Sequence, residues 1–308
     1  AILLLGAGTT FPLVAFALPA GFEIQTVVGG LNLPTTAAFA PDGRIFIAEK
    51  SGRVRVVKEG TLLAAPFLQL SAINDYADHG LIGIALDPNF VSNGWVYLGY
   101  THENNPANYE GAKTGRIVRV KAAGDVADMD TMEILVGSVG GTPAAPSCED
   151  YPLLSDCIPS DEPSHSVGGL RFGPDGKLYA TLGDGASFDI VDPRALRAQN
   201  IDSLAGKMLR INSDGTAPSD NPFFNGDPTA NRSKVWSYGF RNAFRFNFRP
   251  ADGRAYIGDV GWFTWEEINV GAPGANFGWP CREGFAPNSS YGCVAENHVD
   301  PLYAYGHN

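Results

Sequence analysis

A motif of strand, tight turn and strand recurs four times along the chain. The four copies read "FAPDGRIFIAEK" from residue 39, "ALDPNFVSNGWVYLGYT" from 85, "RFGPDGKLYATLGD" from 171 and "NFRPADGRAYIGDVG" from 247. Proline, aspartate and glycine supply the backbone angles that turns need, and the flanking residues alternate between apolar and polar. The sequence therefore predicts a series of antiparallel hairpins.

The spacing of these hairpins predicts an all-β propeller. The turn prolines at 41, 88, 174 and 250 lie 47, 86 and 76 residues apart, and third strands follow as "GRVRVV" at 52, "GRIVRV" at 115 and "GKMLRI" at 206. A period of about 40 to 50 residues with several strands per repeat is typical of propeller blades. We interpret the extra residues, 121–164 and 185–232, as long loops inserted between blades.

The hairpin around Pro174 carries a histidine before one strand and an aspartate after the other. Paired residues of an antiparallel hairpin have a constant sum of residue numbers, which is roughly 350 if the turn centres on Asp175. His165 and Asp184 should therefore face each other at the end away from the turn. An aspartate in that position can orient a histidine as a general base. The alternative is a structural hydrogen bond between the two side chains.

The same arithmetic on the last hairpin places two more polar residues at an equivalent strand end. It sets Arg241 opposite Trp262 and Asn242 opposite Gly261. Equivalent strand ends in a propeller meet at one mouth of the central channel. We therefore expect Arg241 and Asn242 to lie near His165.

The second hairpin adds a further histidine, since His79 should lie opposite Glu103. Several titratable groups would then converge on one cleft, which favours a functional site over a structural clamp. The residues expected to share this pocket are His79, His165, Asp184, Arg241 and Asn242.

The charge balance limits the partners of the chain. Thirty-three acidic residues against 22 lysines and arginines give a formal net charge of -11. Phosphate-rich surfaces repel such a chain, so we expect neither a nucleic acid nor an anionic membrane as partner. No segment after the N-terminal stretch is long and apolar enough to predict a membrane span.

The four cysteines form two close pairs in loop-like sequence, Cys148 with Cys157 and Cys281 with Cys293. They lack the histidines and the CxxC spacing of a zinc site. We predict two local disulfides, which would place the protein in an oxidising compartment. Four buried free thiols are the alternative.

The N-terminal stretch "AILLLGAGTTFPLVAFALPAGF" carries no charge before Glu23. It is similar to the apolar core of a secretory signal but lacks a basic start. We interpret residues 1–20 either as the remainder of a leader or as a first strand, and residues 21–308 as the propeller domain.

Six ordered motifs resemble the soluble pyrroloquinoline-quinone-dependent sugar dehydrogenases of the glucose/sorbosone dehydrogenase type. They are "HGLIGIALDPNF" from residue 79, "HSVGGLRFGPDGKLYATLGD" from 165, "LAGKMLRINSDGTAPSDNPF" from 204, "WSYGFRNAFRFNF" from 236, "GDVGWFTWEEINV" from 258 and "GANFGWPCREG" from 274. The resemblance implies a six-bladed propeller of four-stranded blades. Only four blades and the start of a fifth are visible in the sequence, so we expect the C-terminal part of the ring to be missing from this chain.

The resemblance also implies catalytic roles. His165 matches the family's catalytic base, which takes a proton from the anomeric hydroxyl of a sugar while hydride passes to the quinone. Asp184 matches the carboxylate that orients this histidine. Arg241 matches an arginine that stabilises negative charge developing on the quinone.

Cofactor and metal ligands follow from the same resemblance. His79, Arg241 and Asn242 match cofactor-binding positions, although many members of the family have glutamine where this chain has His79. The backbone carbonyls of Gly261 and Trp262 match those that hold a calcium ion beside the cofactor, and calcium takes such oxygens well.

The implied function is oxidation of an aldose to a lactone by a secreted or periplasmic quinoprotein. A non-catalytic propeller that binds a protein or a glycan at the channel mouth is the alternative, because a fold does not determine a function. The sugar, the electron acceptor and the oligomeric state stay open.

Overall fold

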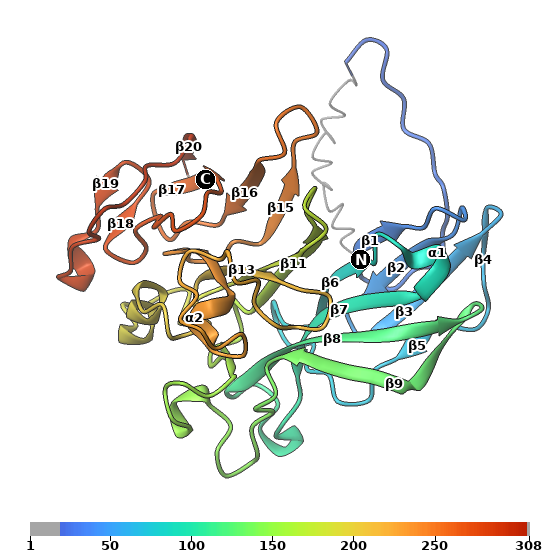
Figure 1. The fold of residues 1–308 in the computed structure, drawn as a ribbon, viewed down its shortest axis with the longest axis horizontal. Helices are drawn as coiled ribbons and strands as arrows, with labels where there is room; N and C mark the ends of the chain where they lie inside the picture. Colours follow the sequence, from blue (N-terminus) through green and yellow to red (C-terminus); the bar gives the residue numbers. More distant parts are fainter. Residues whose placement is uncertain (1–18, 307–308) are drawn as a thin grey trace, which may run out of the picture.

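The computed structural model describes residues 19–306, and these form an all-β, propeller-like arrangement of four main sheets (Figure 1). The sheets follow one another in chain order, from the blue N-terminal sheet to the red C-terminal sheet. Most of the predicted leader region, residues 1–18, lies outside the described residues. No helix between residues 19 and 306 has the length and apolarity needed to cross a membrane.

The first two sheets contain ten strands. In the first sheet the order is β1-β2-β3-β4 with β5 paired to β3, and in the second it is β10-β8-β7-β6 with β9 paired to β8. The strands are β1 (Pro34–Phe39), β2 (Ile45–Glu49), β3 (Arg53–Lys58), β4 (Thr61–Leu62), β5 (Leu68–Gln69), β6 (Leu81–Leu86), β7 (Trp95–His102), β8 (Lys113–Ala123), β9 (Val126–Val136) and β10 (Ile158–Ser160).

The third and fourth sheets have four strands each, in the orders β11-β12-β13-β14 and β15-β16-β17-β20. A two-stranded ribbon, β18-β19, follows the fourth hairpin. The strands are β11 (Val167–Phe172), β12 (Leu178–Leu182), β13 (Lys207–Ile211), β14 (Val235–Tyr238), β15 (Arg245–Phe248), β16 (Ala255–Asp259), β17 (Trp265–Val270), β18 (Arg282–Glu283), β19 (Ala286–Pro287) and β20 (Tyr303–Gly306).

Helical segments are short and lie in the connections. The two α-helices are α1 (Phe90–Asn93) and α2 (Asn231–Lys234), and the 3-10 segments are η1 (Pro106–Asn108), η2 (Cys148–Asp150), η3 (Pro193–Gln199) and η4 (Ser289–Tyr291).

The expected six blades are not observed, because residues 19–306 form four main sheets. Each sheet uses one of the four turn hairpins, and the strand β20 pairs with β17 and completes the fourth sheet, so the expected start of a fifth blade is not observed within residues 19–306. The prediction that residues 121–164 form a long loop was also wrong. It contains β9 and β10, which both pair with β8 in the second sheet.

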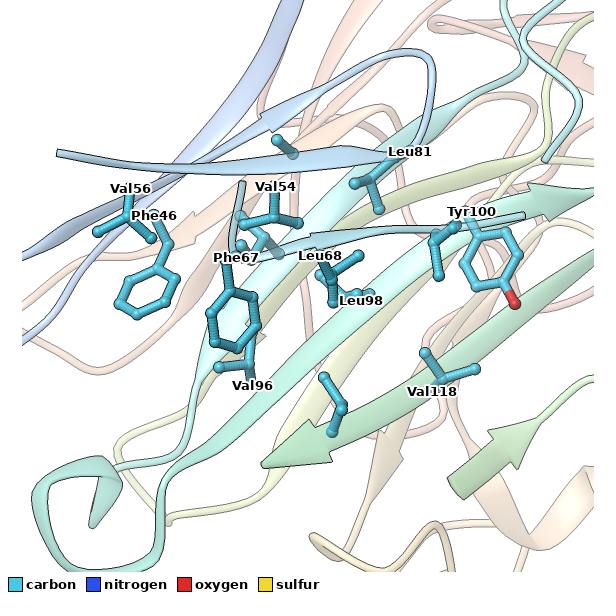
Figure 2. Packing of buried hydrophobic residues seen from close by; sticks show 14 of the residues in the cluster. Phe46, Val54, Val56, Phe67, Leu68, Leu81, Val96, Leu98, Tyr100 and Val118 are labelled. Carbon is cyan, nitrogen blue, oxygen red and sulfur yellow. The ribbon is translucent and has the colours of Figure 1, made fainter. Parts of the chain in front are cut away.

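Apolar side chains fill the space between successive sheets. One cluster joins the first and second sheets, with Phe46 and Phe67 on one side and Val96 and Leu98 on the other (Figure 2). Two further clusters join the second sheet to the third and the third to the fourth. Burying one such side chain fully contributes about 1.5 to 3 kcal/mol, so these layers are a main source of stability.

The first strands of the four sheets, β1, β6, β11 and β15, lie on the inside of the arrangement, and we call them the inner strands. Each contacts the next in turn. Glycine permits this close approach, because a Cβ atom on Gly83 of β6 would lie 2.0 Å from the Leu170 side chain of β11. The fourth sheet also reaches the first, since the Arg245 Nη2 donates a hydrogen bond to the Thr35 carbonyl at 3.1 Å.

Both predicted disulfides are present. Cys148 and Cys157 are bonded with their Cα atoms 5.7 Å apart, and Cys281 and Cys293 are bonded with their Cα atoms 5.2 Å apart. Each bridge closes a short local loop, as the spacing predicted. The alternative of four free thiols is excluded.

Candidate functional site

A pocket of about 270 Å³ lies where the ends of the inner strands converge. Its wall takes residues from all four main sheets, including Thr35 from the first, Ile82 from the second, His165 and Val167 from the third hairpin, and Asn242 just before β15. The pocket is therefore built by the whole arrangement rather than by one blade.

His165 occupies an unusual backbone conformation beside this pocket. Its φ angle is 53°, in the left-handed region that non-glycine residues seldom adopt. The opposite strand end must approach it closely, because a Cβ atom on Gly183 would lie 2.1 Å from the His165 carbonyl oxygen. Backbone strain of this kind costs about 1 to 3 kcal/mol and is often found at functional sites.

The hairpin brings His165 and Asp184 together as the residue-number arithmetic predicted. Val167 pairs with Leu182, and the His165 Nδ1 lies 2.9 Å from the Asp184 Oδ1. The Ala186 backbone N–H also donates to Oδ1 at 2.9 Å. Both side chains are buried.

The environment of Asp184 keeps its carboxylate ionised. Burial by itself raises the pKa of Asp184, but the interactions with His165, the charge of Arg241 and the Ala186 N–H outweigh it, so the pKa lies below its ordinary value. The Trp279 Nε1 donates to the second oxygen, Oδ2, at 2.7 Å. An ionised Asp184 accepts hydrogen bonds only, so the Nδ1 of His165 must be the donor.

This arrangement leaves the other ring nitrogen of His165 available. With the proton on Nδ1, a neutral imidazole presents a lone pair on Nε2. Nε2 has no hydrogen-bond partner among residues 19–306, and His165 lines the pocket. The site can therefore accept a proton from a molecule bound in the pocket.

Arg241 lies next to Asp184, and neither residue is among those that line the pocket. Its carbonyl accepts a hydrogen bond from the Asp184 N–H at 2.8 Å, and its guanidinium lies 5.5 Å from the centre of the Trp279 ring. Burial lowers the pKa of Arg241, while the charges of Asp184 and Asp259 oppose that shift. The Nε atom of Arg241 is buried without a hydrogen-bond partner in the described part of the chain.

Asp259 holds the backbone around Arg241 and Asn242. Its two oxygens accept hydrogen bonds from the N–H groups of Arg241 at 3.1 Å and of Asn242 at 2.6 Å. Burial, followed by the charge of Glu267, raises the pKa of Asp259 well above its ordinary value. The Asn242 side chain makes no hydrogen bond within residues 19–306, and this residue lines the pocket.

The loop with the predicted calcium ligands is tightly held. One oxygen of Glu283, Oε1, accepts hydrogen bonds from the four consecutive backbone N–H groups of residues 262–265, at 2.7 to 3.2 Å. Gly261 has no room for a side chain, because a Cβ atom there would lie 1.4 Å from the Trp265 carbonyl oxygen. The Gly261 carbonyl accepts a hydrogen bond from the Arg241 Nη1 at 2.6 Å.

His79 does not line the pocket. Its Nδ1 lies 2.8 Å from the Asn74 Oδ1 and its Nε2 lies 3.0 Å from the Glu162 carbonyl. Both neighbours are acceptors, so a neutral imidazole donates a hydrogen bond to only one of them. Burial lowers the pKa of His79 to about 4. His79 does not lie opposite Glu103 as expected, because an irregularity between Leu81 and Gly83 shifts the register of the hairpin. A cofactor contact by His79 remains a prediction.

Three buried residues of the site were missed at the level of sequence. Trp279 donates to Asp184, Asp259 anchors two backbone N–H groups, and Glu283 holds the loop at 262–265. Trp279 and Glu283 belong to the motif "GANFGWPCREG", so the motif marked their segment but not their contacts.

A family model described as Glucose / Sorbosone dehydrogenase matches residues 31–305. The chain belongs to this family. The resemblance to pyrroloquinoline-quinone-dependent sugar dehydrogenases is thereby confirmed at the level of the family.

Named relatives of the chain include an enzyme and a protein named for its binding partner. Quinoprotein glucose dehydrogenase B from Acinetobacter calcoaceticus is 27% identical over 88% of this chain and 55% of its own length. Human Hedgehog-interacting protein is 28% identical over 73% of this chain and 31% of its own length. The chain thus spans about half the length of the quinoprotein that it matches.

A solved structure supports the fold. The chain is similar to the PQQ-bound form of aldose sugar dehydrogenase from Streptomyces coelicolor, with a TM-score of 0.64 and 26% identity over 92% of this chain and 71% of that one. Members of the family therefore bind this quinone.

Proposed function

We propose that this protein is a sugar dehydrogenase that uses pyrroloquinoline quinone to oxidise an aldose at its anomeric carbon to a lactone. The observation that carries the proposal is the His165 and Asp184 pair, which presents an unpartnered Nε2 to the pocket. Oxidation of a hydroxyl-bearing carbon releases a proton from the hydroxyl, and a positioned histidine is suited to take it.

Three residues of the chain have separate roles at this site. The His165 Nε2 accepts the proton of the anomeric hydroxyl, while Asp184 holds the imidazole in the required tautomer and stabilises the cation that forms. Trp279 fixes the second oxygen of Asp184 and so keeps the carboxylate from turning away. The bound quinone would supply the acceptor for the hydride.

The polar groups around Asp184 and Trp279 fit an anionic quinone. The Nε of Arg241 and the Nε1 of Trp262 are buried donors without partners in the described part of the chain. Such donors are costly unless a ligand satisfies them. Together with the Asn242 side chain they would bind carbonyl or carboxylate oxygens of the cofactor, and the positive charge of Arg241 would favour electron-rich forms of it.

Calcium does not fit the predicted carbonyls in this arrangement. Calcium takes about six to eight oxygen ligands, and the Gly261 carbonyl already receives the Arg241 guanidinium at 2.6 Å. Residues 19–306 also contain no group of three His, Cys, Asp or Glu side chains that could hold a metal ion. Calcium at Gly261 and Trp262 stays a prediction that requires Arg241 to leave this carbonyl, and no step above depends on it.

The two disulfides indicate the compartment in which this activity would take place. Disulfides persist in oxidising environments, so we place the protein outside the cell or in a periplasm.

The similarity to Hedgehog-interacting protein supports a second candidate, a propeller that binds a protein or a glycan at the mouth of the pocket without chemistry. A binding surface of this kind does not need an ionised aspartate behind a buried histidine. The His165 and Asp184 pair therefore favours the dehydrogenase.

The test measures quinone binding and turnover separately. The protein is titrated with pyrroloquinoline quinone, in calcium and in chelator, while the quinone absorbance is followed, and sugar-dependent reduction of a dye is then measured. We expect binding at micromolar concentration and turnover with at least one aldose. Absence of quinone binding in calcium would contradict the proposal, and binding without turnover of any aldose would favour the second candidate.

A pair of tryptophan variants sharpens this test. Trp262→Phe removes the unpartnered Nε1 together with part of the buried indole ring, so we expect quinone affinity to fall about two- to tenfold with a modest loss of thermal stability. Trp95→Phe is the matched control, because this tryptophan lies on β7 against Arg119 and its Nε1 is not a buried donor without a partner. Equal quinone affinity in both variants would show that Trp262 does not contact the cofactor.

A further inference from the structure

Two arginines lie on neighbouring inner strands without an acidic partner. Arg171 is on β11 and Arg245 begins β15, and both side chains are half-buried. The two strands are adjacent, since a Cβ atom on Gly168 of β11 would lie 2.6 Å from the Ala243 carbonyl just before β15. Within residues 19–306, the hydrogen bonds of both guanidinium groups go only to backbone carbonyls.

The strands around these arginines carry no negative charge. The inner strands read PTTAAF, LIGIAL, VGGLRF and RFNF, so Arg171 and Arg245 are their only charged residues. The whole chain has a formal net charge of -11. The four inner strands thus carry two positive charges and no negative charge, whereas the whole chain is acidic.

Each guanidinium reaches the inner strand on its other side. The Arg171 Nη1 lies 3.4 Å from the Ile84 carbonyl of β6 and 2.9 Å from the Leu170 carbonyl. The Arg245 Nη2 donates to the Thr35 carbonyl of β1 at 3.1 Å, and its Nη1 donates to the Phe244 carbonyl at 2.8 Å. The Nε and Nη2 of Arg171 and the Nε of Arg245 have no acceptor in the described part of the chain.

The two charges act on each other. Burial lowers the pKa of Arg171. Burial, followed by the charge of Arg171, lowers the pKa of Arg245 to about 10, which leaves both groups charged at neutral pH. Two like charges in a half-buried space repel more strongly than they would in water, so the pair is unfavourable by itself. The face of the Phe244 ring, 3.9 Å from the Arg245 guanidinium carbon, relieves only part of this cost.

We infer that Arg171 and Arg245 together bind one small oxyanion, either a phosphate-like ion or a carboxylate, through their unused N–H donors. A guanidinium matches the geometry of both kinds of anion, and an anion between two of them would replace repulsion by attraction. Thr35 and Phe244, which contact Arg245, also line the pocket, so the anion would lie next to it. The inference stands on these two arginines and does not depend on the proposed function.

The test follows thermal unfolding of the protein in phosphate, acetate and chloride at matched ionic strength. Wild type is compared with Arg171→Gln, Arg245→Gln and the control Arg249→Gln, an exposed arginine paired with Asp252. We expect the wild-type Tm to rise by at least ~2 °C in a saturable way with phosphate or acetate, beyond the effect of chloride. Either inner-strand variant should weaken the apparent affinity at least tenfold, and the control should not.

The sign of the mutational effect distinguishes a binding site from a structural role. In low salt without oxyanion, Arg171→Gln should be at least as stable as wild type, because it removes one of two repelling charges. In saturating oxyanion it should be less stable than wild type. Preference for phosphate or for acetate would identify the kind of anion. An equal response of all four proteins to the oxyanions, or a lower Tm of Arg171→Gln under both conditions, would overturn the inference.

Discussion

His165 and His79 stand just before the inner strands β11 and β6, at equivalent ends of two successive sheets, yet their surroundings differ. His165 has an ionised aspartate on Nδ1 and an unpartnered Nε2 at the pocket wall. His79 has an amide oxygen on Nδ1 and a backbone carbonyl within reach of Nε2. The same residue in the same place of the repeat is a candidate base at the pocket in one sheet and is buried away from the pocket in the other.

The difference teaches that strand position alone does not make a catalytic histidine. What matters is a charged partner on one ring nitrogen and a free position on the other. Asp184 supplies the charge in the third sheet, whereas Asn74 offers only a neutral amide to His79. The predictions below test whether this contrast holds.

The largest effect is expected from His165→Ala. Under the proposed function it should lower kcat about 10³- to 10⁴-fold, because the proton acceptor is lost, while quinone affinity stays within about threefold of wild type. The corresponding variant His79→Ala should change kcat little. Stopped assays of dye reduction together with quinone titrations measure both quantities, and an equal loss of kcat in the two variants would break the comparison.

Asp184→Asn should have the next largest effect. It keeps the shape of the side chain but removes the charge that holds the imidazole tautomer, so we expect kcat to fall about 10²- to 10³-fold. Asp78→Asn is the matched control, since Asp78 also lines the pocket and has no bond to His165. Steady-state kinetics of both variants decide the point, and similar values for the two would assign Asp184 a structural role only.

His79 should make stability depend on pH. Its pKa falls from an ordinary value of 6.5 to about 4 on burial, so the folded protein binds a proton less readily than the unfolded chain. Its contribution to stability is therefore fully present above about pH 6.5 and is lost as the pH falls to about 4, by roughly 3 kcal/mol in total. Urea unfolding at a series of pH values measures this loss. If His79→Gln shows the same pH dependence as wild type in this window, the effect belongs to other groups.

The smallest effect is expected from His79→Gln at neutral pH. Glutamine can replace the single hydrogen bond that the neutral ring donates but not the shape of the buried ring, so we expect a loss of about 1 kcal/mol in the free energy of unfolding. Dye reduction should be unchanged. A clear gain in quinone affinity with this substitution would show that position 79 contacts the cofactor after all.

The sequence predicted contacts that are local in the chain. The constant sum of residue numbers across one tight turn predicted that His165 and Asp184 face each other. Short spacings between cysteines predicted both disulfides. The register around His79 was wrong because a single irregularity between Leu81 and Gly83 shifts a strand without any mark in the residue pattern.

Long-range contacts could not be predicted in this way. Trp279 reaches Asp184 across 95 residues and Glu283 anchors a loop about 20 residues earlier, and neither contact has a periodic signal. The six blades implied by the resemblance were not observed either. The count of four turn hairpins matches the four main sheets. Two strands of the second sheet, β9 and β10, were hidden in a segment whose prolines and polar residues indicated a loop.

The hydrogen bond between Thr35 and Arg245 joins residues 210 positions apart, so it can form only late in the synthesis of these 245 residues. A ribosome adds about 5 to 20 residues per second, so Thr35 emerges roughly 10 to 40 s before the residues that meet it. The first sheets can pack against each other during that interval, but the pocket has no fourth wall until Asn242 and Phe244 have left the ribosome. A ligand of this pocket can therefore act on the nascent chain only after residue 245 has left the ribosome, and a pause in translation beyond that residue would lengthen the time in which the wall can close.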